Sequence, residues 1–333
     1  MKNPRHFKRA LITGISGSGG SYLAEYIRRE HSGVAVHGTT RWHSTTNARN
    51  LEAIGGEIFV HECDLMDFSS VLRVLLAVKP DVIFHLASFA NVLAAFDTPI
   101  AAYQNNVMAT INLLEAIRAA NIDPLIQLCS SSEVYGQADA DQIPIREDCP
   151  MRPNNPYAAS KAAQDVLGHA YWKSYGLKVV RTRMFTYFNP RRHDLFATAF
   201  ALQVARVEVG LQDTLRHGNL QSRRTIIDVR DAVIAYWAAA ERGEVGEVYN
   251  IGGDNEVMVG TVLESLKVRA RRDIPSREDA ALLRPVDLVS QVPDSTKFRS
   301  ATGWAPQLKL DASIDILLSY CRSVVQDEMT HCK

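Results

Sequence analysis

The sequence predicts an α/β fold, a doubly wound parallel sheet with a smaller, mostly helical C-terminal lobe. From residue 8 to residue 128, short continuous apolar runs alternate with helical patterns. Such runs are typical of parallel strands that helices cover on both faces. A glycine-rich turn joins the first run to the first helical pattern, and beyond residue 184 helical patterns broken by glycine and proline dominate. In sheets of this kind, ligands bind at the carboxyl ends of the strands.

The expected elements follow from the spacing of the apolar residues. In the first part of the chain the apolar runs predict strands over 10–13, 34–38, 58–61, 82–86 and 125–129. The segments between them predict helices over 21–30, 48–54, 69–78 and 99–120, and a helix over 156–175 and a strand over 178–183 follow. Later we expect helices over 195–209, 229–241, 259–271 and 311–325, and a strand over 248–251. We therefore predict a sheet domain at 1–183, to which 226–252 return, and a second lobe at 184–333.

The composition narrows the class of protein. The 333 residues are 46% hydrophobic and 22% charged, and Lys plus Arg equal Asp plus Glu at 37 each. A net charge of zero argues against a protein that works by coating nucleic acid or an anionic membrane. No apolar run approaches the roughly 20 residues that span a bilayer. The five cysteines are scattered, without C-x-x-C spacing, so we expect reduced thiols in a cytoplasmic protein and no metal site.

The glycines at positions 14, 17 and 20 lie where the first strand turns into the first helix. Glycine there accepts positive φ and allows a close approach of the backbone to a bound group. The start of the helix points unpaired N–H groups and its positive dipole end at that group, which suits a pyrophosphate. An ordinary βα turn would look the same, because a lone glycine-rich turn is a weak signal.

Tyr157 and Lys161 stand four residues apart in the expected helix over 156–175 and therefore share a face. A nearby ammonium lowers the pKa of a phenol, which would let Tyr157 accept a proton from a substrate hydroxyl. An amphipathic helix could carry the same pair by chance. The position favours the catalytic interpretation, because the helix follows the segment 129–136 that leaves the fifth strand at its carboxyl end.

The order of the motifs resembles that of the extended short-chain dehydrogenases/reductases, which have a Rossmann sheet. The motifs are the glycine turn, Asp64-Leu65, His85-Leu86-Ala87, Asn106, the segment 131–136 (Ser-Ser-Glu-Val-Tyr-Gly) and Tyr157-x-x-x-Lys161. Later motifs, at 190–192, 218–219, 228–231, 246–250 and 284–287, make the chain similar to the GDP-mannose 4,6-dehydratase branch and its relatives, the GDP-4-keto-6-deoxymannose reductases. The resemblance runs nearly from end to end.

The resemblance implies a reaction and a role for each catalytic residue. Tyr157 would take the proton from the sugar O4 while Ser131 bonds the same oxygen, and Lys161 would hold the nicotinamide ribose and tune Tyr157. After hydride leaves C4 for the cofactor, Glu133 would remove the acidified C5 hydrogen. Loss of water from C6 and return of hydride to C6 complete a 4,6-dehydration without net redox change. The alternative for Glu133 is an acid in a surface turn.

The region after the second strand indicates which cofactor binds. It carries no acid for a ribose 2′-OH but has Arg41, with Ser44 nearby, which favours a 2′-phosphate and hence NADP. Alternatively, Arg41 is merely exposed or lies at a subunit contact. The resemblance implies the full cofactor set, in a domain 1–183 that binds NADP: Gly14, Ser16, Gly17, Gly20, Arg41, Asp64 (at the adenine), Leu65, Leu86, Ala87, Asn106, Tyr157 and Lys161.

The substrate implied is a nucleotide-diphosphate sugar, most simply a GDP-sugar, held by the lobe at 184–333. The candidate substrate residues are Ser132, Asn189, Arg192, Arg224 and Arg284, of which the arginines suit the diphosphate unless they are structural ion-pair partners. The chain departs from the family pattern at Thr186 (usually Asn), at Ser88-Phe89-Ala90 (usually Ala-Gln-Ser) and at Thr225 (usually Asp). Because these positions face the sugar in relatives, we expect an altered sugar, such as a modified hexose or a heptose.

Other functions remain open at this point. A 4-keto-reductase or an epimerase would use the same Ser131, Tyr157 and Lys161. A sensor that binds NADP without turnover would share the fold but predicts a degraded catalytic set. The helices over 99–120 and 156–175 resemble those that pair two subunits in relatives, so we expect a homodimer, or a tetramer through the segment 41–50.

Overall fold

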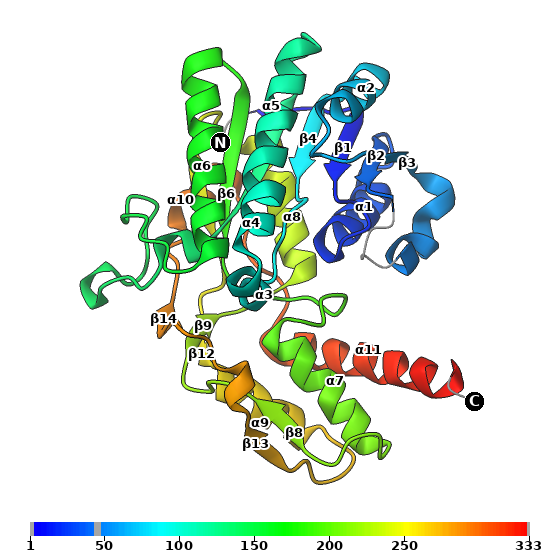
Figure 1. Cartoon of the computed structure of the whole chain (residues 1–333), viewed down its shortest axis with the longest axis vertical. Coiled ribbons are helices and arrows are strands. Elements are labelled where there is room, and N and C mark those ends of the chain that lie inside the picture. Colours follow the sequence, from blue (N-terminus) through cyan, green and yellow to red (C-terminus); the bar gives the residue numbers. More distant parts are fainter. Residues whose placement is uncertain (1–2, 43–47, 332–333) are drawn as a thin grey trace.

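The computed structural model describes residues 3–42 and 48–331 and contains the expected parallel sheet. Its seven strands are β1 (Arg9–Thr13), β2 (Ala35–Thr40), β3 (Phe59–Glu62), β4 (Val82–His85), β5 (Leu125–Ser131), β6 (Lys178–Met184) and β11 (Val248–Ile251). They lie in the order β11-β6-β5-β4-β1-β2-β3, and every neighbouring pair is parallel. The order reverses between β1 and β4, where ligands of doubly wound sheets bind. The predicted fold class is therefore confirmed (Figure 1).

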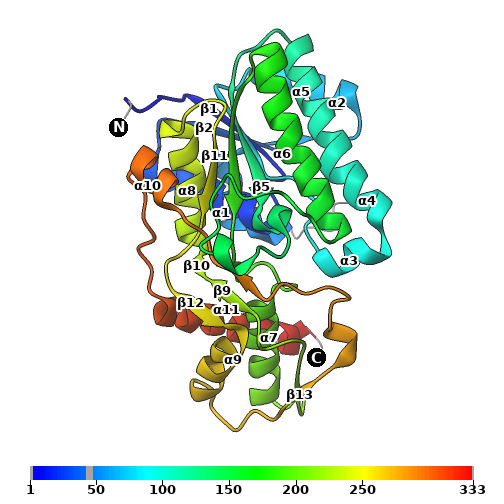
Figure 2. The same cartoon turned by 90° about the vertical axis from the view of Figure 1, so that its left-hand side faces the viewer.

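Helices cover both faces of the sheet because alternate strand residues point to opposite sides. In β1, Ala10 and Ile12 join the core under α1 (Ser18–Glu30) and α8 (Val229–Arg242), while Leu11 joins the core on the other face. That other face is covered by α2 (Phe68–Val78), α5 (Ala109–Ala119) and α6 (Pro156–Tyr175). Figure 2 shows α5 and α6 side by side along this face.

The lobe below the sheet in both views has its own apolar core (Figures 1 and 2). This core lies among α7 (Phe196–Glu208), α9 (Val259–Val268) and α11 (Leu310–His331). Short strands complete the lobe, and they are β8 (Leu215–His217) with β13 (Ser276–Glu278), and β9 (Arg223–Thr225) between β12 (Glu256–Met258) and β14 (Ser290–Gln291). A strand pair, β7 (Tyr187–Phe188) with β10 (Ile227–Asp228), lies at the junction of lobe and sheet domain. Among the helices within residues 3–42 and 48–331, none is both long and apolar enough to cross a membrane.

Two segments return from the second half of the chain to the sheet domain. The strand β11 and the helix α8 lie within 226–252, as expected, and α10 (Thr296–Thr302) also packs against both of them. The sheet layer is thus built from three stretches of chain. The predicted division of the chain into a sheet domain and a second lobe at residue 184 remains a proposal.

The expected helix over 99–120 is interrupted. It consists of α4 (Pro99–Tyr103), a single π turn, η2 (Gln104–Met108), and α5. The wide turn aims Asn106 at the loop after β4, where its amide accepts from Phe89 N (2.7 Å) and donates to Phe89 O (3.1 Å). Turns of this kind occur often at functional sites. The expected helix over 48–54 is instead a run of 3₁₀ turns, η1 (Ala48–Glu57).

A buried ion cluster fixes the helix α6 against β6. Asp165 on α6 accepts from Arg181 Nη1 and Arg183 Nε, each at 2.9 Å. Arg183 also donates to the hydroxyl of Tyr135 (2.8 Å), in the turn η3 (Ser132–Tyr135) that follows β5. Burial alone would raise the pKa of Asp165, but the bonds and charges of Arg183 and Arg181 outweigh it, so the pKa is lowered.

We expect Asp165→Asn to lower the free energy of unfolding by about 3–5 kcal/mol, because it leaves two buried guanidinium groups without their counter-charge. Urea unfolding at neutral pH measures this. In the wild type, the lowered pKa means that the contribution is present at neutral pH and is lost as the pH falls through the folded-state pKa. Glu57→Gln is the control, since Glu57 pairs with Arg28 at 3.2 Å but its side chain is 56% exposed. The control should change stability by less than about 0.5 kcal/mol, and an equal loss in both variants would contradict the prediction.

Candidate active site

Two cavities meet at the carboxyl ends of the strands. The first, of about 1260 Å³, extends from the glycine turn past the end of β2 to the helix α11 of the lobe. The second, of about 440 Å³, lies between the turn after β5 and the lobe. The residues that line both cavities are Leu86, Ser88, Ala90, Cys129, Tyr187, Arg192, Asp194 and Tyr236. A ligand in one cavity therefore lies next to a ligand in the other.

The glycine turn is built for close approach. Gly14 has φ +70°, and a Cβ there would lie 3.0 Å from Ala87 Cα. At Gly20 a Cβ would lie 2.4 Å from the carbonyl oxygen of Gly14. The helix α1 begins at Ser18 after Gly17, which has no side chain to bond the first-turn amides. A side chain at Gly14 or Gly20 would collide with the backbone around the turn, so glycine keeps the turn tight. A tight turn at the start of a helix fits the pyrophosphate of a dinucleotide.

Nine of the twelve expected cofactor residues line the first cavity, and they are Gly14, Ser16, Gly17, Gly20, Arg41, Asp64, Leu65, Leu86 and Ala87. Tyr157 and Lys161 line the second cavity instead, with Leu86 common to both. Asn106 lines neither cavity, because its amide is used on Phe89 and on the hydroxyls of Ser88 and Ser160. Ser44 lies in the stretch 43–47, which is outside the described residues.

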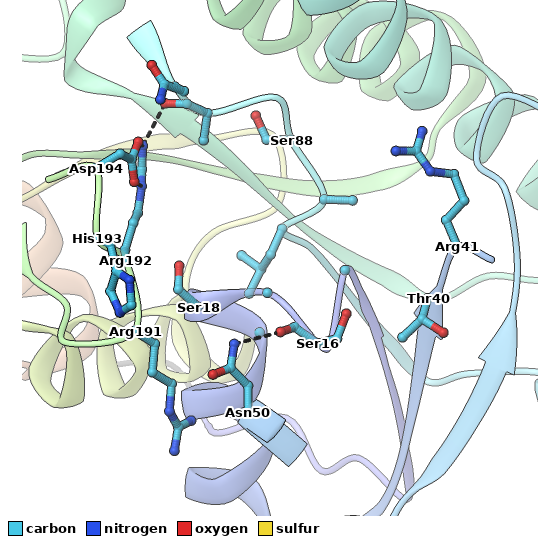
Figure 3. A pocket seen from close by; sticks show the side chains of 18 of the residues that line it. Ser16, Ser18, Thr40, Arg41, Asn50, Ser88, Arg191, Arg192, His193 and Asp194 are labelled. Atoms are coloured by element: carbon cyan, nitrogen blue, oxygen red, sulfur yellow. Dashed lines mark hydrogen bonds and ion pairs between the residues drawn. The ribbon is translucent and has the colours of Figure 1, made fainter. Parts of the chain in front are cut away.

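The opposite wall of the first cavity is formed by the segment 191–194, of which we assigned only Arg192 to the site from the sequence, at the substrate. Figure 3 shows Arg191 to Asp194 across the cavity from Ser16 and Ser18, with Arg41 at the far end beyond β2. Arg191 donates to Ser21 Oγ (2.9 Å) and Glu25 Oε1 (2.6 Å) on α1. Asn50 donates to Ser16 O (3.0 Å) and so supports the glycine turn. No local pattern marks these contacts, since they join segments far apart in the sequence.

The expected catalytic residues Ser131, Glu133, Tyr157 and Lys161 all line the second cavity. Ser131 ends β5, and its Oγ accepts from Glu133 N (3.2 Å), which sets the turn that carries Glu133. Asn155 accepts from Ala158 N (2.7 Å) and caps α6, while its Nδ2 donates to Glu133 Oε2 (3.1 Å). One residue therefore starts the helix of Tyr157 and holds the carboxylate of Glu133.

The electrostatics of Tyr157 differ from the sequence-based expectation. Burial raises the pKa of the phenol, and the first charge that opposes this is the guanidinium of Arg192, not the ammonium of Lys161. Lys161 donates to Cys129 O (2.6 Å) and Gln164 Oε1 (2.5 Å). Burial lowers the pKa of Lys161. We predicted that Lys161 lowers the pKa of the phenol. This prediction is wrong for the protein without ligands, because burial of Tyr157 raises the pKa and dominates over the charges nearby.

Four of the five expected substrate residues, Ser132, Arg192, Arg224 and Arg284, line the second cavity. Arg284 Nη1 lies 3.6 Å from Glu133 Oε1. Arg224 donates to the carbonyls of Arg223 (2.7 Å) and Leu288 (3.0 Å), so part of its guanidinium serves the lobe itself. Asn189 lines neither cavity, since it is buried and accepts from Arg191 N (3.1 Å) in the loop before α7.

Three of the positions that depart from the family pattern, Ser88, Ala90 and Thr186, line the second cavity, whereas Phe89 and Thr225 do not. Arg192 crosses from the lobe and donates to Ala90 O (2.6 Å) (Figure 3). In the part of the chain that the structure describes, no cluster of three or more His, Cys, Asp or Glu residues could hold a metal ion.

Fold and site together define an enzyme of the extended short-chain dehydrogenase/reductase class, with a cradle for a nicotinamide dinucleotide beside a second cavity that holds Tyr157 and Lys161. The sequence model of the family described as GDP-mannose 4,6 dehydratase matches residues 11–317. The chain belongs to this family.

The similar proteins include both enzymes of the branch. A GDP-6-deoxy-D-mannose reductase from Pseudomonas aeruginosa is 30% identical over 323 residues, which are 96% of this chain and 99% of that protein. GDP-mannose 4,6 dehydratase 1 from Arabidopsis thaliana is 31% identical over an alignment of 332 positions, which covers 93% of this chain and 89% of that protein. The solved structure of RMD from Pseudomonas aeruginosa complexed with NADPH has a TM-score of 0.83 and 28% identity, and covers 95% of this chain and 99% of that one.

Proposed function

We propose that this chain is an NADP-dependent 4,6-dehydratase that acts on a nucleotide sugar of the GDP-mannose type. The observation that carries the proposal is the position of Glu133. Its carboxylate lines the same cavity as Ser131 and Tyr157 and is held by Asn155 (3.1 Å). A dehydratase needs such a group, because the C5 hydrogen must be removed by a base other than the one that deprotonates O4.

Each residue has a separate task in this reaction. Tyr157 takes the proton of the sugar O4, and Ser131 hydrogen-bonds the same oxygen. Bound NADP supplies the hydride acceptor for C4 and the hydride donor for C6. The ketone at C4 acidifies the C5 hydrogen; Glu133 removes it as a proton and passes that proton to the C6 hydroxyl, which leaves as water. When hydride returns to C6, C5 takes up one proton, which balances the proton that O4 gave to Tyr157. Arg284 and Arg192 bind the diphosphate with charge-assisted hydrogen bonds. When Arg284 turns from Glu133 to the diphosphate, the carboxylate of Glu133 loses this ion pair and can act as a base.

The second candidate is a 4-keto-reductase, and it is supported by the 30% identity to the Pseudomonas aeruginosa reductase. In that direction Tyr157 would donate its proton to a ketone oxygen at C4. The pKa of Tyr157, raised by burial, suits a proton donor at neutral pH. Glu133 would then have no proton to remove, so the two candidates differ in whether this carboxylate is needed.

Incubation with GDP-mannose and a catalytic amount of NADP, without added reductant, tests the proposal. We expect the 4-keto-6-deoxy sugar in mass spectrometry, with no net consumption of NADPH. Glu133→Gln should bind NADPH as the wild type does but form product at least about 100-fold more slowly, because the amide cannot take the proton. If GDP-mannose is not a substrate, a panel of GDP-hexoses and GDP-heptoses follows, since Ser88, Ala90 and Thr186 shape the cavity.

Three results would contradict the dehydratase. Undiminished product formation by Glu133→Gln would remove this residue from the mechanism. Reduction of a 4-keto sugar with stoichiometric loss of NADPH, together with inert GDP-mannose, would identify a reductase. Tight binding of NADPH without turnover of any sugar in the panel would favour a sensor protein.

We propose NADP over NAD because Arg41 follows β2 and lines the first cavity. A guanidinium at this position suits a 2′-phosphate. Arg41→Ala should weaken NADPH binding by roughly 10–100-fold, the value of charge-assisted bonds, and leave NADH binding almost unchanged. Fluorescence titration measures both affinities. Arg29→Ala, which removes an exposed arginine of α1 that lines neither cavity, is the control. Equal affinities of Arg41→Ala and wild type for NADPH would contradict this assignment.

We also propose a cytoplasmic homodimer formed through the outer surface of α4, α5 and α6. Ile100 of α4 (72%) and Val166 of α6 (51%) are exposed, as is Met108 (45%) in the π turn η2 between α4 and α5. Apolar side chains gathered on one helical surface are typical of subunit interfaces. Sedimentation equilibrium should give twice the chain mass, and a single-chain mass at micromolar concentration would contradict the dimer. A tetramer through 41–50 would give four times the chain mass.

A further inference from the structure

A chain of buried polar side chains runs behind the two cavities from the end of β1 to Lys161. Its members are Thr13, His85, Thr110 and Gln164, all of them buried, and none of them lines either cavity. The proposed reaction uses none of these four groups. Each makes at least two side-chain hydrogen bonds, and the bonds leave only one arrangement of hydrogens.

The arrangement begins at Thr13. Its Oγ1 accepts from Leu86 N and Ala87 N, each at 3.2 Å, so its hydroxyl hydrogen is directed to His85 Nδ1 at 2.9 Å. His85 Nδ1 is thus an acceptor, and the ring hydrogen lies on Nε2. Burial and the charge of Lys161 lower the pKa of His85 to about 3, so the ring is neutral at physiological pH.

The arrangement continues through Thr110. Its hydroxyl donates to Asn106 O (2.6 Å), a carbonyl in the π turn η2. Its lone pairs accept from His85 Nε2 (2.9 Å) and Gln164 Nε2 (2.7 Å). Because Thr110 occupies the amide nitrogen of Gln164, the amide oxygen faces the other way and accepts from Lys161 Nζ (2.5 Å).

This arrangement decides how Lys161 points its donors. An ammonium has three N–H donors. Gln164 Oε1 and Cys129 O take two of them, and the third is left for the second cavity, which Lys161 lines. Tetrahedral geometry then fixes the direction of the third donor.

We propose that Gln164, held by Thr110 and His85, is a positioning residue that directs one N–H of Lys161 at the nicotinamide dinucleotide. This inference rests on the proposed function in that Lys161 binds the cofactor. Gln164 acts only through Lys161, because it reaches neither cavity.

The charged and titratable groups around Lys161 are few. Asp165 and Tyr157 lie on the same helix, Cys129 lies on β5 and His85 on β4. Since the pKa of Lys161 is lowered by burial, binding that depends on the ammonium weakens as the pH rises through that pKa. The amide oxygen of Gln164 stabilises the charged form, so a change at Gln164 shifts this loss of binding along the pH scale.

The test measures the dissociation constant of NADPH by fluorescence as a function of pH, without any sugar. Gln164→Met removes the acceptor, and we expect about 10-fold weaker binding at neutral pH. Its loss of binding at alkaline pH should move to lower pH by about one unit. Gln164→Glu returns an acceptor with a negative charge, and its alkaline loss should move to higher pH by about one unit. Opposite shifts are not expected from a residue that only supports the fold.

The matched control is Gln127→Met, which removes a buried amide on β5 that donates to Thr182 (2.7 Å) and does not contact Lys161. It should lower the melting temperature and leave the pH profile of NADPH binding unchanged. If Gln164→Met does not fold, the shift in Gln164→Glu decides. If both Gln164 variants lose NADPH binding at the same alkaline pH as the wild type, the proposal is overturned. A different result would contradict the proposed function itself. This would be the case if the wild type keeps its affinity for NADPH at alkaline pH and Lys161→Met binds NADPH as tightly as the wild type, because Lys161 would then have no role in cofactor binding.

Discussion

A buried ammonium needs acceptors around it, and in this protein that requirement organises the centre of the site. Lys161 lies in the middle of the structure, on a helix that packs against β5 and β6. Its nitrogen donates to the backbone of β5 at Cys129 and to Gln164 one turn further along α6. Taking a charge out of water costs several kcal/mol unless such partners are in place. The strand, the helix and the π turn behind them therefore have to fit together before the site exists.

The helix α6 concentrates most of the polar groups on which the site depends. It carries Tyr157 and Lys161 at the second cavity and, one turn further on, Asp165 at the arginines of β6. Asn155, which caps its first turn, also holds Glu133. A small rotation of this helix would therefore displace the phenol of Tyr157, the ammonium of Lys161 and, through Asn155, the carboxylate of Glu133. The buried ion cluster around Asp165 holds the helix against such a rotation.

The lobe contributes through arginines that reach across to the sheet domain. Arg191 donates hydrogen bonds to side chains of α1 beside the glycine turn. Arg192 donates a hydrogen bond to Ala90 O in the loop after β4, where the two cavities meet. Burial raises the pKa of Tyr157, and the charge that most strongly opposes this increase is that of Arg192. The segment between β7 and α7 thus links the lobe to the sheet domain and affects the pKa of Tyr157.

Local patterns in the sequence determined much of this protein. Apolar runs and helical spacing predicted all seven strands of the sheet, because the inner strands are buried on both faces and the covering helices on one. The edge strand β3 was predicted from its short apolar run although it is largely exposed. The glycines at 14, 17 and 20 predicted the cradle, since Gly14 has a positive φ and a Cβ at Gly20 would collide with the turn. The spacing of Tyr157 and Lys161 placed both on one side of a helix. These features depend on neighbours within a few residues, so the sequence displays them directly.

Only the tertiary structure decided which polar groups meet. Thr110 joins Gln164 across 54 residues and Arg192 joins Ala90 across 102, and no periodicity encodes such pairs. For the same reason Asn106 and Asn189, expected in the site, are buried behind its walls, whereas Asn50, unmarked in the sequence, supports the cradle. Arg191 belongs to the motif at 190–192, but nothing in the sequence showed that it faces the cradle. The pKa of Tyr157 was likewise beyond local reasoning, because burial is a property of the whole fold.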